Sequence, residues 1–265
     1  MTEEFSILAV LVQSFRLFFK RILIFTLLPI VAYSPLALTV SVATMLFEDS
    51  FVPFFIYVLL LPLSPLAITH YALELEKGNT VGIFQSLRAA SKALIPNFIT
   101  IIRSMLDLIG LFILIAGFVF LLGSTAITII LLVIAVWYFL KVQCTHCLLF
   151  PIMLAEKKYF SRAIRQSRYL TQDNKVRLFV ILNICPIIIC SSIFLLFGLE
   201  SSFSEESIQS LLRTTSVLWY MGVTFSLYFS LFPIFITVSY ILLRNELDEP
   251  DVEKLDKPYE NEDTL

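Results

Sequence analysis

The residues best suited to chemistry lie in one short stretch, CTHC, from Cys144 to Cys147. A Cys-x-x-Cys spacing places two thiols on one helix face, where they can form a redox pair or, with His146, part of a zinc site. A structural zinc site needs four ligands, and the other cysteines, Cys185 and Cys190, belong to a separate apolar segment. Because cysteine also packs as a small apolar residue, the sequence favours packing over a metal or redox role.

A second group, His70, Glu74 and Glu76, offers acid and base side chains near the end of an apolar segment. The chain has neither a nucleophile-elbow motif nor a glycine-rich phosphate loop, and its glycines number only 7. We therefore expect these three residues to lie at a membrane interface, wetted by the cytoplasm. The sequence predicts no enzyme, no catalytic residue, no metal and no cofactor.

The composition indicates where these residues must sit. Hydrophobic residues make up 58% of the chain, phenylalanine occurs 25 times, and charged residues make up 15%, which is typical of an integral membrane protein. A helix needs about 20 apolar residues to cross the hydrocarbon core. Six segments meet this requirement, near 21–45, 51–73, 97–121, 125–154, 177–198 and 214–243.

The basic residues predict the orientation of these spans. They precede the first span and fill the second-to-third and fourth-to-fifth connections, whereas the alternate connections are short and mostly acidic or neutral. Positive charge stays on the cytoplasmic side, so both termini are expected to be cytoplasmic. Residues 1–243 then form the six-span domain, and the acidic residues 244–265 form a disordered cytoplasmic tail.

A repeated motif explains how each pair of spans begins. QSFRLFFK starts at Gln13, QSLRAASK starts at Gln85, and a related RQSRYLTQ starts at Arg165. On a helix the polar residues of each copy share one face, so we expect an interfacial helix whose basic face meets lipid phosphates. The faces consist of Gln13, Arg16 and Lys20, then Gln85, Arg88 and Lys92, then Arg165, Arg168 and Gln172.

The predicted fold is thus all-α, with six transmembrane helices in three hairpins, each preceded by a cytoplasmic interfacial helix. The simplest role for the basic faces is to anchor and orient the chain. The alternative role is a docking surface for anionic lipid or for a protein.

Charges inside the third and fourth spans form a further candidate site. Asp107 and Lys141 lie at nearly equal distances along the chain from a turn at Gly123 and Ser124, so a tight hairpin brings them together. Arg103 precedes Asp107 by one turn and can join the pair. Since a lone charge is costly in the bilayer, we expect a neutralised cluster that fixes helix register; the alternative is a proton or ion site of a permease.

The residues from Val81 to Ile101 and from Leu148 to Phe179 resemble the YciC-like bacterial inner-membrane proteins. They are also similar to the wider group named after the membrane domain of glycerophosphoryl diester phosphodiesterase. The shared pattern is an apolar stretch ending in an acid, here Glu156, then a short basic helix before another span. That helix carries Ala163, Ser167, Leu170 and Thr171.

The chain departs from the family where many relatives have Pro-Gly and this one has Ala116 and Gly117, and its fourth span is longer. The resemblance implies a six-span protein of the bacterial cytoplasmic membrane. Two functions remain open: a non-enzymatic scaffold or accessory protein of the cell envelope, or a permease or channel for a small solute, ion or lipid. The expected partners are membrane lipids, including anionic headgroups, and a membrane protein or a second copy, with no nucleic acid.

Overall fold

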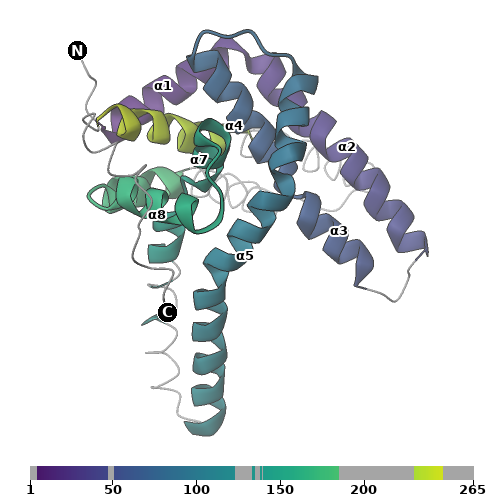
Figure 1. Cartoon of the computed structure of the whole chain (residues 1–265), viewed down its shortest axis with the longest axis vertical. Helices are drawn as coiled ribbons and strands as arrows, with labels where there is room; N and C mark the ends of the chain where they lie inside the picture. The colour runs from purple at the N-terminus through teal and green to yellow at the C-terminus, as the bar shows by residue number, and fades with distance from the viewer. Residues whose placement is uncertain are drawn as a thin grey trace, which may run out of the picture.

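A computed structural model describes residues 5–46, 51–122, 133–134, 138, 140–184 and 230–246. Every element in these ranges is a helix (Figure 1), which confirms the predicted all-α class. In chain order the labelled helices are α1 (Ile7–Lys20), α2 (Ile22–Leu46), α3 (Val52–Leu60), α4 (Leu63–Glu76), α5 (Ile83–Leu122), α7 (Leu149–Glu156) and α8 (Phe160–Thr171). Residues 140–146 and 175–184 are also helical, and a C-terminal helix covers Ser230–Asn245.

Helix α1 begins at a capped end and ends at a bend. The Ser6 hydroxyl accepts a hydrogen bond from the Ala9 amide at 3.1 Å, which satisfies one of the unpaired donors of the first turn. At the other end Arg21 leaves the helical conformation, and its amide donates to the Phe18 carbonyl. Figure 1 shows α1 and α2 meeting at an angle there, where the sequence predicts the change from interfacial helix to span.

Two described segments are long and apolar enough to cross a membrane, Ile22–Ala43 and Ile56–Glu76. They overlap the first and second predicted spans, 21–45 and 51–73. The second segment runs through α3 and α4, which are separated at Leu61 and Pro62. Proline explains this local break, because it has no amide hydrogen to continue the helical bonding.

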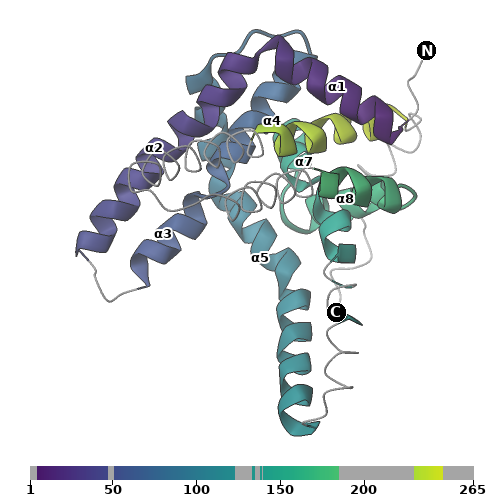
Figure 2. The same ribbon diagram turned by 180° about the vertical axis from the view of Figure 1, so that it is seen from behind.

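Helix α5 differs from the expected arrangement. The sequence predicts an interfacial helix around Gln85 to Lys92 and a separate span over 97–121, but one helix of 40 residues covers both. At 1.5 Å per residue it is about 60 Å long. Strong helix formers around Ala93 and Leu94 carry the helix up to Pro96, which is tolerated inside it at the cost of one backbone bond. Figure 2 shows α5 extending well beyond the other labelled helices.

The predicted fourth span is also interrupted. Helical residues up to His146 are followed by a turn at Cys147 and Leu148, and α7 begins at Leu149. Pro151 provides the reason, since it cannot donate a hydrogen bond to the carbonyl four residues earlier, that of Cys147. The predicted turn at residues 123 and 124, the fifth span beyond residue 184 and the sixth span before residue 230 lie outside the described residues.

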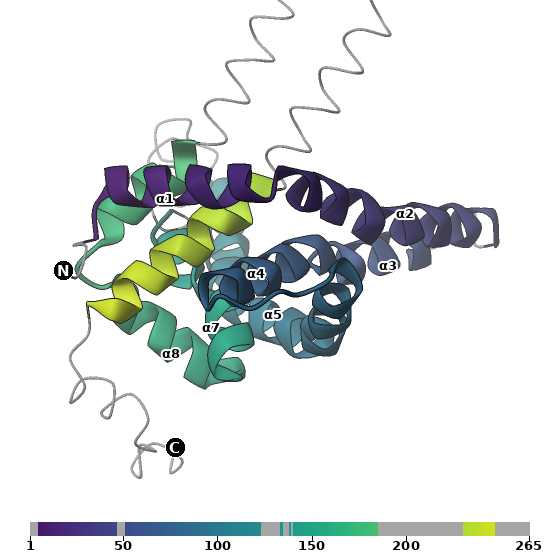
Figure 3. The same cartoon turned by 90° about the horizontal axis from the view of Figure 1, so that it is seen from above.

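The C-terminal helix completes an aromatic core. Figure 3 shows it, in yellow, running beside α1 toward the junction of α1 and α2. The ring of Phe25 lies 6.1 Å from that of Phe18 and 5.2 Å from that of Tyr71, and Phe235 contacts Phe15 edge to face at 5.8 Å. These contacts join α1, α2 and α4 to the C-terminal helix. The helix continues to Asn245, so Arg244 belongs to it, and the tail from residue 247 onward lies outside the described residues.

Candidate functional site

The most highly connected polar group that the structure describes is the carboxylate of Glu156, at the end of α7. Its Oε1 accepts hydrogen bonds from the Tyr240 hydroxyl at 2.7 Å and from the Gln166 side-chain amide at 2.5 Å. Lys158 Nζ lies 3.0 Å from Oε2, and Arg244 Nε lies 3.6 Å from Oε1. Glu156 thereby joins the end of α7, helix α8 and the C-terminal helix.

The connection between α7 and α8 creates this arrangement. Lys157 ends α7 in the left-handed region with φ 53°, and Phe160, at the start of α8, also has a positive φ of 57°. Such conformations are costly for residues other than glycine and persist where surrounding contacts hold them. One such contact is the hydrogen bond from the Phe160 amide to Thr100 Oγ1 of α5, at 3.1 Å. The turn returns the chain so that Lys158 and α8 reach Glu156.

The electrostatics of the site favour the ionised acid. Burial by itself raises the pKa of Glu156, but hydrogen bonds from Tyr240, Gln166 and Lys158 together outweigh it, so the pKa lies below its ordinary value. The group is therefore a carboxylate at neutral pH. With its oxygens already bonded to protein donors, it is suited to hold three segments together rather than to accept a proton from a substrate.

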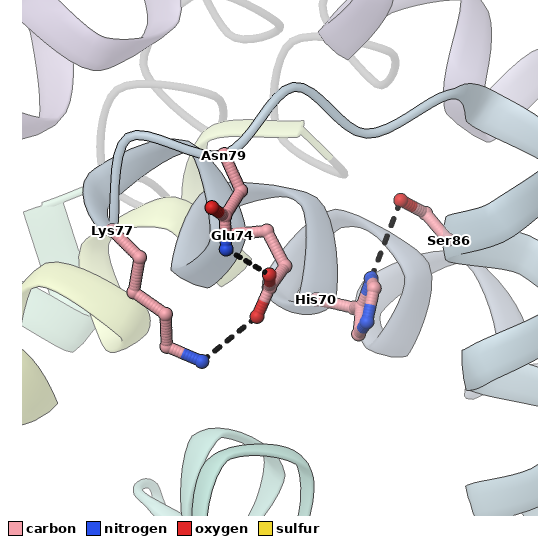
Figure 4. Close-up of polar contacts among 5 residues, drawn as sticks. All are labelled: His70, Glu74, Lys77, Asn79 and Ser86. Carbon is pink, nitrogen blue, oxygen red and sulfur yellow. Dashed lines mark hydrogen bonds and ion pairs between the residues drawn. The ribbon is translucent and has the colours of Figure 1, made fainter.

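A second polar cluster joins α4 to the start of α5 (Figure 4). Nδ1 of His70 lies 3.4 Å from the Ser86 hydroxyl. The Glu74 carboxylate accepts from Lys77 Nζ and from the side-chain amide of Asn79, each at 2.8 Å. The described bonds of Glu74 thus go to the α4–α5 connection and not to the imidazole. Ser86 is fully buried. A serine nucleophile must reach its substrate, so this pair is better suited to helix packing.

The three repeated helices share one orientation toward the protein. The serine of each Gln-Ser pair, Ser14, Ser86 and Ser167, is 0% exposed. The Ser167 hydroxyl donates to the Thr145 carbonyl at 2.7 Å. All the basic residues predicted to face lipid are exposed, namely Arg16, Lys20, Arg88, Lys92, Arg165 and Arg168. The repeat therefore turns a serine inward and its cations outward each time.

The glutamines of the repeat behave differently from the prediction. Gln13 was expected on the basic face, but its side-chain amide donates to Glu76 Oε1 at 3.0 Å. Gln166, which was not predicted as a site residue, donates to Glu156 in the same way. Two of the three glutamines therefore donate to an acid at the end of an apolar helix, Glu76 of α4 and Glu156 of α7. The signal was the Gln-Ser pair itself, which occurs in all three copies; Gln85 instead accepts from the Gly82 amide at the start of α5.

The CTHC stretch packs into the helix bundle. Cys144 and His146 are buried, and the Cys147 thiol donates to the Cys144 carbonyl at 3.1 Å. Within the described ranges, no three His, Cys, Asp or Glu side chains gather closely enough to hold a metal ion. Cys185 and Cys190 lie outside those ranges.

The predicted intramembrane charge cluster is described in part. Arg103 and Lys141 are both exposed on their helices. The side chain of Asp107 and the turn that would bring it to Lys141 lie outside the described residues. The pairing of Asp107 with Lys141 stays a prediction.

Comparisons with protein-family models, with curated proteins and with solved structures find no match to this chain.

Proposed function

We propose that this chain is a multi-pass protein of the bacterial cytoplasmic membrane that acts as a non-enzymatic scaffold or accessory protein of the cell envelope. The observation that carries this proposal is the Glu156 site. Its carboxylate is bonded by Tyr240, Gln166, Lys158 and Arg244, so this acid serves helix packing rather than chemistry. The proposal includes the six-span, three-hairpin arrangement and the resemblance to the YciC-like proteins.

Two features support the membrane assignment. The segments Ile22–Ala43 and Ile56–Glu76 have the length and hydropathy of spans. In α5 the part after Pro96 alone is about 39 Å long at 1.5 Å per residue, enough to cross the hydrocarbon core of about 30 Å. The part before it carries Arg88 and Lys92, exposed and suited to the cytoplasmic interface.

Topology tests the membrane assignment directly. With both termini cytoplasmic, a cysteine placed at Ser202 lies outside and one placed at Thr80 lies inside. An impermeant thiol reagent added to intact spheroplasts should label Ser202→Cys and should label Thr80→Cys after lysis only. The opposite pattern contradicts the orientation, and equal labelling of both positions in intact cells contradicts the spans between them.

A buried amide makes a permease the second candidate. Asn97, one residue after Pro96 in α5, is fully buried, and both polar atoms of its side chain are without a hydrogen-bond partner among the described residues. A buried unpaired amide is costly and is the kind of group that binds a small polar ligand.

Purification of the chain with its native lipids separates the two functions. Mass spectrometry should detect a co-purified protein for a scaffold and a stoichiometric small ligand for a permease. The matched variant Asn97→Leu removes the amide and keeps a similar volume, so a ligand that is lost from this variant alone identifies a permease site. A protein partner that both chains retain supports the scaffold.

A further inference from the structure

Helix α1 exposes a continuous apolar stripe. Leu8, Val12, Phe15 and Phe19 follow one another at spacings of four, three and four residues, which places them on one side of the helix. Leu8 is 70% exposed, Val12 59% and Phe19 64%. The opposite side of α1 is buried against the protein through Val10, Ser14, Leu17 and Phe18.

The stripe leads into the first candidate span. Beyond the bend at Arg21, exposed apolar residues continue along α2 at Leu23, Leu27 and Ile30, again at spacings of four and three residues. These residues belong to the segment Ile22–Ala43, which is long and apolar enough to cross a membrane. In a membrane, the exposed apolar residues of α2 contact lipid, and the stripe on the adjoining α1 is suited to contact the same lipid.

Charge decides which lipid this surface fits. Arg16, Lys20 and Arg21 are all exposed and lie within six positions of one another, and the sequence of α1 contains no acidic residue. Cations beside an exposed apolar stripe match the boundary between acyl chains and phosphates. Each cation near an anionic surface adds attraction that a zwitterionic surface does not provide.

We propose that α1 lies in the cytoplasmic face of the bilayer as a docking surface for anionic phospholipid. The side chains of Leu8, Val12 and Phe19 enter the acyl region, and Arg16, Lys20 and Arg21 bind the phosphates. This inference rests on the proposed membrane assignment and adds the chemistry of the lipid that the first interfacial helix binds.

Label depth tests the position of α1. A full-length chain without its native cysteines carries one nitroxide at Val12→Cys or Phe19→Cys and is reconstituted in phosphatidylcholine containing about a quarter phosphatidylglycerol. Power saturation should give both labels high accessibility to oxygen and low accessibility to a water-soluble nickel complex. Thr80→Cys, in the exposed α4–α5 connection, is the control for water, and Leu27→Cys in α2 is the control for the bilayer.

The controls separate the two levels of the proposal. If nickel reaches the α1 labels as readily as the Thr80 label, while the Leu27 label is accessible to oxygen only, α1 does not lie in the bilayer. The membrane assignment then still holds. Labels on α1 that are shielded from both reagents show a protein, such as a second copy, covering the stripe, and also overturn the proposed α1 surface. A Leu27 label that nickel reaches overturns the membrane assignment itself.

A second measurement tests the lipid class. The ratio of phosphatidylglycerol to phosphatidylcholine that co-purifies with the chain is compared with that of a variant carrying Arg16→Gln, Lys20→Gln and Arg21→Gln. The loss of one surface charge corresponds to about a fivefold change in preference, so the ratio at this surface should fall at least fivefold. An unchanged ratio overturns the preference for anionic lipid, since the three residues that define it are then without effect.

Discussion

At the scale of single residues, the most informative group is an acid that is bonded by side chains from three segments. Glu156 receives donors from the residues just after it, from α8 and from the C-terminal helix. Removing its charge leaves Lys158 and Arg244 close together without the anion between them. An acid in this position contributes more to stability than an exposed acid with one donor.

The change Glu156→Gln should therefore lower the thermal midpoint of the detergent-solubilised chain. We expect the free energy of unfolding to fall by about 2 kcal/mol, because hydrogen bonds to a charged group contribute about 1.5 to 3 kcal/mol. The matched control is Glu76→Gln. Glu76 is exposed and accepts one bond, from Gln13. The Glu76→Gln variant should therefore lose less than about 1 kcal/mol in free energy of unfolding. Equal effects of the two changes would contradict the role given to Glu156.

The same carboxylate predicts a dependence on pH. Since the pKa of Glu156 is lowered in the folded chain from its ordinary value of 4.5, the unfolded chain binds more protons as pH falls through that value. The stabilisation by Glu156 is thus complete above pH 4.5 and is lost as pH falls through the lower, folded pKa. The midpoints of the native chain and of Glu156→Gln should differ at pH 7 and converge as the pH is lowered below 4.5. A constant difference would contradict a lowered pKa.

At the scale of helices, the repeated Gln-Ser pair buries one serine in each of three helices, and each serine has different neighbours. Each serine is turned inward, yet their hydroxyls meet different groups. Ser167 donates to the Thr145 carbonyl and Ser86 lies against His70, whereas the Ser14 hydroxyl has no hydrogen-bond partner among the described residues. The Gln-Ser pair therefore fixes the orientation of a helix, while the surroundings of each copy determine what the serine contributes.

This difference predicts that the same substitution has different effects on stability at Ser167 and at Ser14. Ser167→Ala removes the bond to Thr145 and should cost about 1 kcal/mol, while Ser14→Ala replaces a buried unpaired hydroxyl and should leave stability unchanged or slightly raised. Thermal midpoints of the two variants, measured in the same detergent, provide the comparison. A larger loss for Ser14→Ala than for Ser167→Ala would contradict the contacts described.

Much of the helical arrangement could be predicted from the sequence, and its interruptions could not. Apolar run length predicted the helices over 21–45 and 51–73 because the length needed to cross a bilayer is a local property. The continuity of α5 through Pro96 and the break at Cys147 depend on how neighbours replace a missing backbone bond. The donors of Glu156 could not be predicted either, since Tyr240 lies 84 positions away along the chain.

At the scale of the whole molecule, contacts between distant parts of the sequence close the bundle. The Phe5 amide donates to the Glu246 carboxylate, and Arg177 donates to the Phe5 carbonyl at 2.6 Å. The Ser230 hydroxyl donates to the Phe25 carbonyl at 2.7 Å. The C-terminal helix thereby ties the first helices to the Glu156 site.

Truncation tests the role of this helix. A chain that ends at Glu246 keeps every contact just described and should unfold at the same temperature as the full chain. A chain that ends at Leu243 loses Arg244 and Glu246, and its midpoint should fall by several degrees, as expected for a loss of about 2 kcal/mol in a chain of this size. Equal midpoints for the two truncations would contradict the closing role of Arg244 and Glu246.

The bond between Phe5 and Glu246 also sets an order of events during synthesis. The two residues are 241 positions apart, and ribosomes add about 5 to 20 residues per second. Roughly 12 to 50 s thus pass between the synthesis of Phe5 and that of Glu246. Glu156 is made before Tyr240 and Arg244 and meets Lys158 and Gln166 first. Among the contacts described, those of the C-terminal helix therefore form last, because residues 230–246 are synthesised after all of their partners.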